Sequence, residues 1–320
     1  MAGLRRPRHI EFRSPLRSYP DADAVESGHD EGRVIEAAVS ILFLGLAYAM
    51  ILYIISVGLS VTMGLMGFVN LAHGAFAMAG GYVTVTLMNR YGVPFGAALL
   101  LACVSVALLS VVLERTLYAR LYGAGELEQV LFTIGLVFMA VAVVRKIWGS
   151  LPQPITLPAA LSGQIDLGFR SFPTYRSFLI AFSLTLILLL WLGVERTNFG
   201  ARLRAAVDNR RMAESLGINT SQLFTLSFAL GSGLAALGGG LGADILAIYP
   251  GYAMEYLVYF LMVVAVGGLG SIRGPFVAAL LLGIGDTACK YLVPQLGAFF
   301  IYLAMIGLLL WRPAGLFGRA

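Results

Sequence analysis

Long apolar stretches, separated by short polar breaks, run along most of this chain. Nine of them can be recognised, at roughly 35–60, 66–88, 95–114, 127–147, 178–194, 221–242, 256–270, 275–292 and 296–311. An α-helix needs about 20 apolar residues to cross the hydrocarbon core of a bilayer. The pattern therefore predicts an all-α, polytopic membrane protein. The short alternating segments typical of a membrane β-barrel do not occur in the chain.

The composition agrees with this prediction. The chain has 320 residues, of which 59% are hydrophobic and only 12% are charged, whereas soluble domains carry roughly 25% charged residues. The net charge of +5 is too diffuse to indicate nucleic-acid binding. The two cysteines, Cys103 and Cys289, both lie inside apolar stretches, which argues against a disulfide or a metal site.

Residues 1–33 differ from the rest of the chain, because a group of arginines is followed by a group of acidic residues. We expect this segment to be a disordered cytoplasmic tail, followed by a membrane domain over residues 34–320. A cleaved signal peptide is not indicated, since the apolar stretch after the tail is too long and lacks a cleavage site.

The distribution of arginine predicts the orientation, because cytoplasmic loops carry an excess of basic residues. Segment 195–219 should be cytoplasmic, since it holds Arg196, Arg202, Arg204, Arg210 and Arg211. The C-terminus should be cytoplasmic too, and the segments at 150–175 and 243–255 external. Nine spans would then put the N-terminus outside, whereas the arginines of the tail favour the inside. Three short segments within 35–88 would give ten spans, and a re-entrant glycine-rich segment would give eight; Gly58, Gly64 and Gly67 are candidate breaks.

The segment at 65–83 reads LMGFVNLAHGAFAMAGGYV and places Asn70 and His73 among apolar and small residues. Polar side chains at bilayer depth are costly unless they face other protein or a water-filled cavity. A translocation path is one interpretation, and a hydrogen-bonded contact between helices is the other. The tetrapeptides HGAF at 73–76 and RGPF at 273–276 resemble each other, either as traces of an internal repeat or by chance.

The Arg-rich segment predicts two short helices rather than a flexible connector. Asn198 can cap the first helix, Asp208 or Asn209 the second, and Asn219 the next span, while Gly217 suits a left-handed C-terminal position. An ordered cytoplasmic element needs something to pack against. A soluble partner protein and the lipid headgroups are the two candidates.

Small residues recur at helical spacing in segment 228–244, with Gly231, Ala235 and Gly239 as one series and Gly238 and Gly242 as another. Such spacing permits close crossing of helices. Ser232, in the same segment, either faces a pore or bonds back to its own helix. Asp286 and Lys290 form an i, i+4 pair that can neutralise itself.

No motif for energy conversion or hydrolysis is visible. Neither lysine is followed by Ser or Thr, so there is no nucleotide-binding P-loop, and there is no zinc-protease HExxH motif. Gly231-Ser232-Gly233 resembles a serine nucleophile turn only faintly, because no histidine follows it in the chain. We therefore predict no catalytic residue, no metal ligand and no cofactor in this chain.

Several segments together resemble one family. They are GLMGFVNLAHGAFAMAGGY, TNFGARLRAAVDNRRMAESLGIN, FALGSGLAALGGGL, VVAVGGLGSIRGPFVAALLLG and the C-terminal WRPAGLFG. In this order they are similar to the permease subunits of the high-affinity branched-chain amino acid class of ABC importers, specifically the H-type of its two paralogous permeases. The likeness runs from about residue 36 to 318, whereas the tail at 1–33 departs from the short N-terminus of the family.

The resemblance implies a multi-pass permease of the bacterial inner membrane. Its partners would be a paralogous second permease, an external substrate-binding protein and two cytoplasmic ATPases that bind ATP and Mg. Segment 195–219 would be the loop that couples to the ATPases, through Gly200, Arg204, Ala205, Ala213 and Gly217. The path would be lined by Asn70, His73, Gly74 and Ser232.

The substrate and the mechanism remain open at this stage. Relatives move leucine, isoleucine and valine, and similar permeases serve urea, short amides or aromatic acids. An ion-coupled secondary transporter is an alternative, for which Asp286 would be the buried carboxylate. An intramembrane serine hydrolase that uses Ser232 is a further alternative.

Overall fold

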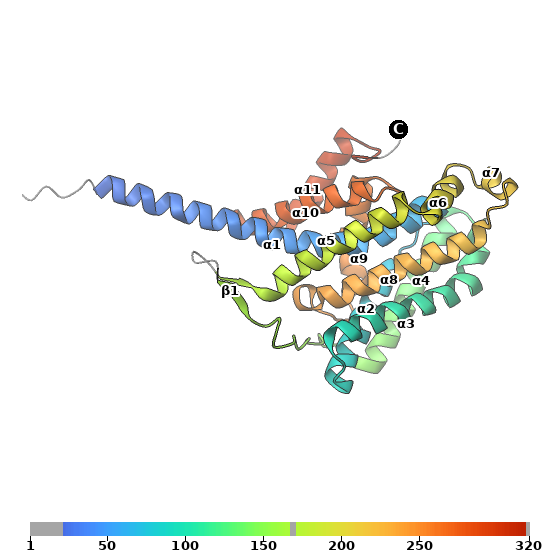
Figure 1. Cartoon of the computed structure of the whole chain (residues 1–320), viewed down its shortest axis with the longest axis horizontal. Helices are drawn as coiled ribbons and strands as arrows, with labels where there is room; N and C mark the ends of the chain where they lie inside the picture. Colours follow the sequence, from blue (N-terminus) through green and yellow to red (C-terminus); the bar gives the residue numbers. More distant parts are fainter. Residues whose placement is uncertain (1–21, 167–170, 318–320) are drawn as a thin grey trace, which may run out of the picture. The chain divides into compact units, whose positions relative to one another are not determined.

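The computed structural model describes residues 22–166 and 171–317 (Figure 1). The chain divides into two units, residues 1–39 and residues 40–320, and the fold described below is that of the second unit. Of the predicted tail at 1–33, residues 1–21 lie outside the described part, and the remainder belongs to the start of α1. The side of the membrane on which the tail lies stays a prediction.

Among the described residues, the long helices match the predicted apolar stretches one for one. They are α1 (Ala22–Met66), α2 (His73–Tyr91), α3 (Phe95–Thr116), α4 (Glu126–Trp148), α5 (Thr174–Glu195), α8 (Thr220–Leu246), α9 (Tyr252–Gly267), α10 (Arg273–Leu292) and α11 (Pro294–Trp311). Six of these helices are long and apolar enough to cross a membrane, and α9 and α11 contribute shorter apolar helices. The all-α polytopic architecture is confirmed.

Smaller elements lie at the two ends of the helices (Figure 1). At one end are α6 (Asn198–Asp208) and α7 (Arg210–Ser215), and at the other are the antiparallel strands β1 (Gln164–Asp166) and β2 (Ser171–Pro173). A short 3-10 helix, η1 (Tyr118–Leu121), follows α3. The backbone N–H of Gln153 donates to the carbonyl of Ile248 (2.8 Å), so the two connections predicted on the external side lie together.

The first glycine-rich segment contains a break between helices. α1 ends at Met66, Gly67 has a φ of +57°, and residues 67–72 are not helical. The predicted stretch at 66–88 therefore begins too early. Since α1 and α2 are the two helices found between residues 35 and 88, the interpretation with three segments there is wrong.

The break turns the chain back along α1. His73, the first residue of α2, bonds through Nε2 to the carbonyl of Ile55 (2.9 Å). Ile55 lies 11 residues before the end of α1, which is about 16 Å along the helix axis. Residues 67–72 thus return the chain toward the middle of the bundle, and α2 starts there. Non-helical backbone at membrane depth is tolerated where it is buried in protein, and Phe68, Asn70 and Ala72 of this segment are buried.

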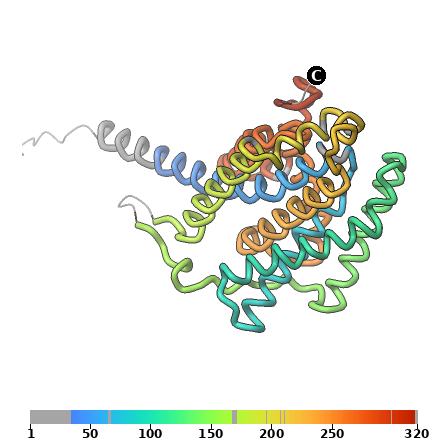
Figure 2. The backbone as a smooth tube through the Cα atoms, turned by 45° about the vertical axis from the view of Figure 1, so that its right-hand side comes forward, coloured from blue at the N-terminus to red at the C-terminus, as the bar shows by residue number. Residues whose placement is uncertain are grey.

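Helix α8 packs closely against α1 and α2 through glycines, and Figure 2 shows it running beside α2 and α3. A Cβ atom on Gly239 would overlap the carbonyl oxygen of Ala77, and one on Gly80 would overlap the backbone of Ala236. Gly231 faces Gly58 of α1 in the same way. The predicted small-residue spacing in 228–244 is therefore used for helix crossings.

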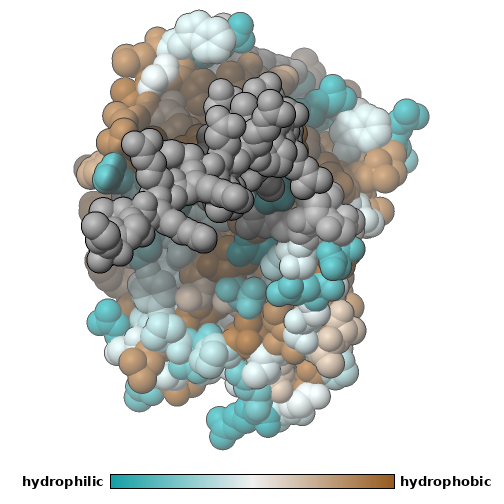
Figure 3. All heavy atoms as spheres, turned by 90° about the vertical axis from the view of Figure 1, so that its left-hand side faces the viewer, coloured by the Kyte–Doolittle hydropathy of each residue, from teal (hydrophilic) through white to brown (hydrophobic). Residues whose placement is uncertain are grey.

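Apolar side chains are also exposed on the outer surface, and on the face shown in Figure 3 they lie among hydrophilic ones. Exposed large apolar residues are frequent on α3 and α4, including Leu100, Leu108, Val112, Phe138 and Met139. A soluble domain of this size would expose far smaller contiguous apolar patches. These faces of α3 and α4 fit contact with lipid chains.

Candidate translocation and coupling sites

Asn70 anchors the break between α1 and α2. Its side chain is 1% exposed, and its Oδ1 accepts hydrogen bonds from the Ala72 backbone N–H (3.1 Å) and from the Tyr118 hydroxyl (3.1 Å). Burial raises the pKa of the Tyr118 phenol, so this group stays a neutral donor. Asn70 thus shapes the turn before α2 and ties it to η1.

Gln129 of α4 holds the neighbouring residue of the break. Its Oε1 accepts from the Val69 backbone N–H (3.2 Å), and its Nε2 donates to the carbonyls of Leu121 (3.3 Å) and Ala124 (3.2 Å). The ring of Phe68 packs against that of Tyr118, with 5.3 Å between the centroids. The break is therefore fixed by contacts with the connection between α3 and α4.

Glu114, near the end of α3, is a buried carboxylate that sequence reasoning missed. It accepts hydrogen bonds from the Thr225 hydroxyl of α8 (2.7 Å) and from the Tyr122 hydroxyl. Tyr118 and Gln129 were missed as well. Each of these residues looks like an ordinary polar residue at the edge of an apolar stretch, so only their neighbours in space reveal their role.

The hydrogen bond between Asn70 and Tyr118 makes a testable prediction about stability. We expect Asn70→Ala to lower the free energy of unfolding by about 1–3 kcal/mol, because it leaves the buried Tyr118 hydroxyl without a partner. The double variant with Tyr118→Phe should be no less stable than Asn70→Ala alone. Unfolding in mixed detergent measures both, with the exposed Tyr91→Phe as control; fully additive losses would contradict the bond.

His73 and Gly74 fix the start of α2. The His73 side chain is fully buried, and its Nδ1 has no hydrogen-bond partner in the described part of the chain. A Cβ on Gly74 would overlap the carbonyl oxygen of Ala253 in α9. The two residues hold α2 against α1 and α9, which is the predicted helix-contact interpretation; a role in the path stays a prediction.

Ser232 lies on α8 and is 1% exposed. Its Oγ makes no hydrogen bond with any described residue. Of the two alternatives for Ser232, the bond back to its own helix is therefore wrong, and a place facing a pore stays a prediction. Three further buried polar atoms also have no hydrogen-bond partner among the described residues: Asn70 Nδ2, the hydroxyl of Ser56 on α1 and the hydroxyl of Tyr252 on α9. Buried polar atoms without protein partners are rare and call for water or a ligand.

The Arg-rich loop is ordered as two short helices, as predicted. Thr197 caps α6, its Oγ1 accepting from the Gly200 N–H (3.3 Å), so the predicted cap at Asn198 is wrong by one residue. Asn209 caps α7 by accepting from the Met212 N–H (3.0 Å). Asn219 caps α8 by accepting from the Gln222 N–H (3.0 Å).

Gly217 ends α7 in the predicted left-handed conformation, with a φ of +79°. The N–H of Ile218 donates to the carbonyl of Ala213 (3.0 Å), which is the closing bond of a Schellman motif. This turn brings Ile218 onto a small cluster of buried and partly buried side chains, which we call the loop cluster: Phe199, Leu203, Ala206, Ala213, Ile218 and Leu223. The loop therefore has a core of its own.

Gly200 and Arg204 join α6 to the end of α5. A Cβ on Gly200 would overlap the carbonyl oxygen of Val194. The guanidinium of Arg204 donates to this same carbonyl. Of the other predicted coupling residues, Ala205 is half-buried and Ala213 is buried in the loop cluster. Gly200 and Ala213 are buried within the loop, whereas Arg204 and Gly217 are exposed, and the contact of these residues with a partner stays a prediction.

The outer surface of the loop carries two large apolar residues that sequence reasoning missed. Met212 is 59% exposed and Leu216 is 73% exposed, and both belong to the α7 region. The sequence did carry a signal, since the two positions are four residues apart and share a helix face. Apolar side chains this exposed at the end of a bundle mark an interaction surface.

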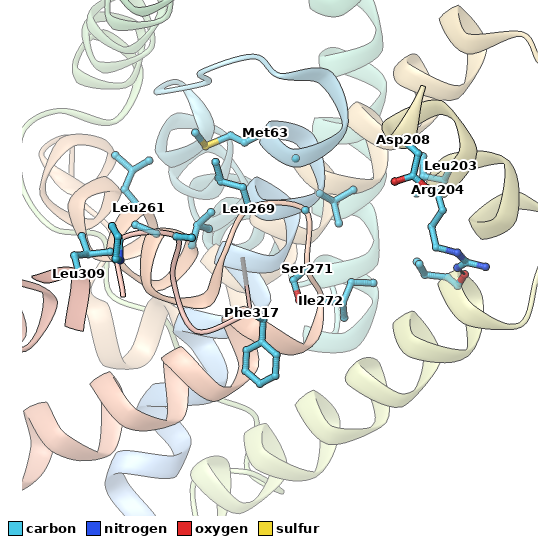
Figure 4. Close-up of a pocket in the computed structure, with 18 residues that line it drawn as sticks. Met63, Leu203, Arg204, Asp208, Leu261, Leu269, Ser271, Ile272, Leu309 and Phe317 are labelled. Carbon is cyan, nitrogen blue, oxygen red and sulfur yellow. Dashed lines mark hydrogen bonds between the residues drawn. The ribbon is translucent and has the colours of Figure 1, made fainter. Parts of the chain in front are cut away.

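A cavity of about 870 Å³ lies between α6 and the bundle (Figure 4). Arg204 and Asp208 of α6 border one side, and Ser271 and Ile272 of the α9–α10 connection border another. Asn70, His73 and Ser232 do not line it. The cavity lies at the end of the bundle beside α6, and the predicted path residues Asn70, His73, Gly74 and Ser232 are buried elsewhere in the bundle.

Comparison with known proteins decides the family. The profile of the family described as the permease component of the branched-chain amino acid transport system matches residues 41–309. The chain belongs to this family. It is therefore a permease subunit of an ABC importer, a transport protein rather than an enzyme, and a multi-pass protein of the bacterial inner membrane.

Individual relatives agree over nearly their whole length. The permease protein BraD of the high-affinity branched-chain amino acid transport system of Pseudomonas aeruginosa is 28% identical, covering 89% of this chain and 96% of BraD. The corresponding protein LivH of Escherichia coli K12 is 27% identical, covering 86% and 92%. A probable LivH of Methanocaldococcus jannaschii is 25% identical, covering 85% and 90%. As a permease of this kind, the chain works with ATPase and other partner subunits.

Proposed function

We propose that this chain imports branched-chain or closely related hydrophobic amino acids as half of a permease pair. A paralogous permease would form the other half, an external binding protein would deliver the substrate, and two cytoplasmic ATPases would bind ATP and Mg. The observation that carries the proposal is the family match over residues 41–309, with the names of the relatives pointing to the substrate. An alternative cargo of urea, short amides or aromatic acids would use the same machinery.

We place the ATPase contact on the α6–α7 loop, with Met212 and Leu216 as the side chains that enter a groove of the ATPase. Their exposure supports this choice. The loop would move as a rigid body, because its cluster ties α6 and α7 to α8. The bond of Arg204 to Val194 and the close packing of Gly200 on Val194 fasten α6 to α5. ATP-driven motion would then reach α5 and α8 and bias the bundle between inward-open and outward-open states.

We place the path beside the break between α1 and α2. Three of the residues predicted there, Asn70, His73 and Ser232, each hold a buried polar atom without a partner among the described residues. Water or a passing solute would satisfy these atoms in the open states. Gly74 would let α2 begin against α9 without a gap.

The test is transport by the complete importer in lipid vesicles, with both permeases, both ATPases and the binding protein. We expect uptake of labelled leucine that needs ATP on the ATPase side and persists when ionophores collapse the ion gradients. Uptake that follows a proton or sodium gradient without ATP would contradict the proposal. The ion-coupled alternative has no support from Asp286, because Lys290 already pairs with it (2.6 Å).

A further inference from the structure

A second cavity, of about 360 Å³, lies among the ends of helices far from the coupling loop. Arg176, which lines it, sits at the start of α5, and the coupling loop follows the end of this helix. The 19 residues between Arg176 and Glu195 span about 28 Å along the helix. With the loop on the cytoplasmic side, the cavity opens on the external side. Its volume lies within the range of small-molecule sites.

Two cations and two anions line the cavity, and one ion pair among them leaves a single cation and a single anion for a ligand. Lys290 Nζ and Asp286 Oδ2 lie 2.6 Å apart, so this pair neutralises itself. The side chains of Arg176 and Glu255 also line the cavity, and within the described part of the chain neither has an ion-pair or hydrogen-bond partner. The cavity therefore offers one guanidinium and one carboxylate to a ligand that carries both charges.

Aromatic and aliphatic residues form most of the remaining wall, and Thr287 adds a hydroxyl that donates to the carbonyl of Gly283 in its own helix (2.9 Å). The rings of Tyr256 and Tyr259 lie with centroids 6.0 Å apart, and the Tyr256 hydroxyl donates to the Leu246 carbonyl (2.9 Å), which holds that ring in place. Aromatic faces attract an ammonium group. Leu44 and Ile245 add branched apolar surface.

We propose that this cavity binds an α-amino acid with an aliphatic side chain as it enters from the external side. The carboxylate of the amino acid pairs with Arg176, and its ammonium group lies between Glu255 and the tyrosine rings. The side chain packs on Leu44 and Ile245. The inference rests on the proposed function, and it narrows the cargo: urea and short amides lack both charges, and an aromatic acid without an amine leaves Glu255 unpaired.

Direct binding tests the site. The purified complex of both permeases and the ATPases, without the binding protein, is placed in nanodiscs of phosphatidylglycerol and titrated with labelled leucine. We expect Arg176→Gln and Glu255→Gln each to raise the Kd by at least about tenfold, as for a lost hydrogen bond to a charged group. Arg90→Gln and Asp244→Asn are matched controls, because both residues are exposed near external helix ends and do not line the cavity. Thermal unfolding checks that all variants fold.

Two truncated leucine analogues assign each charge to its partner. Isoamylamine lacks the carboxylate, so it should compete only weakly with labelled leucine, and its inhibition constant should be the same in Arg176→Gln as in the unmodified complex. The acid 4-methylpentanoate lacks the amine, so its inhibition constant against labelled leucine should be the same in Glu255→Gln as in the unmodified complex. If both analogues compete equally less well with labelled leucine in both variants, the assignment of partners is overturned.

The outcomes separate this site from the proposed function. If the importer transports leucine but both variants bind leucine as the unmodified complex does, the site is wrong and the function stands. If the importer transports no amino acid at all, the proposed function fails. If phosphatidylethanolamine in the nanodiscs abolishes leucine binding while both variants still transport leucine normally, the cavity holds a lipid headgroup and the proposal is overturned.

Discussion

Gly239→Ala should lower the free energy of unfolding by about 3 kcal/mol, the upper part of the usual range for overpacking a closed core. The added Cβ would overlap the carbonyl oxygen of Ala77, which is helix backbone and cannot rotate away. On the other side of the same crossing, Gly80 lies against the backbone of Ala236. The helices α2 and α8 would have to separate, and the break before α2 would lose its support. Thermal and denaturant unfolding of the purified importer measure the loss.

Gly135→Ala is the matched control for this change. Gly135 also lies inside a helix, α4, but a Cβ there would meet nothing within 4 Å. Alanine has the higher helix propensity, so this variant should be unchanged or more stable by up to about 1 kcal/mol. Similar behaviour of the two variants would contradict the close crossing of α2 and α8.

The sequence predicts the helices and the short helices of the coupling loop with little error. The reason is that each long helix is a continuous apolar stretch, and the caps at Asn209 and Asn219 and the turn at Gly217 are local signals. Where two neighbouring residues can both cap a helix, the predicted cap can be wrong by one residue. This happens at α6, where Asn198 was predicted and Thr197 is the cap.

The sequence does not predict how the break between α1 and α2 is held. Asn70 is conspicuous because it is polar in an apolar stretch, but its partner Tyr118 lies 48 residues away. Glu114 and Thr225 are 111 residues apart. Such contacts depend on how the helices pack, and no spacing along the chain encodes them.

The role of a single residue also depends on whether its side chain points into the fold or out to the surface, which the sequence does not show. Arg204 was predicted to couple to a partner, and that role stays a prediction; within the fold its guanidinium donates to the end of α5. The exposed apolar residues Met212 and Leu216 received no prediction, since each looks like core in a chain that is 59% hydrophobic. In a membrane protein, hydrophobicity alone does not separate the lipid face, the core and a docking surface.

Leu216→Asp should abolish ATP-driven uptake while leaving the permease folded. Leu216 is 73% exposed in this chain, so the change removes little packing from the fold. In the proposed complex the same side chain enters an ATPase groove, where an aspartate would lose apolar contact and bury an unpaired charge. A central apolar contact of this kind is worth about 2 kcal/mol or more, so we expect binding at least about 30-fold weaker.

The readouts for Leu216→Asp distinguish docking from transport itself. The ATPases should no longer co-purify with the permease, and stimulation of ATP turnover by the loaded binding protein should vanish, with the thermal stability of the permease unchanged. Leu127→Asp is the control, because Leu127 is 71% exposed at the start of α4, where an acidic residue suits the helix dipole. If uptake falls in Leu216→Asp while the ATPases remain bound and stimulated, energy does not enter through this face of α7. The fastening of α6 to α5 by Gly200 and Arg204 would then serve only to fold the loop.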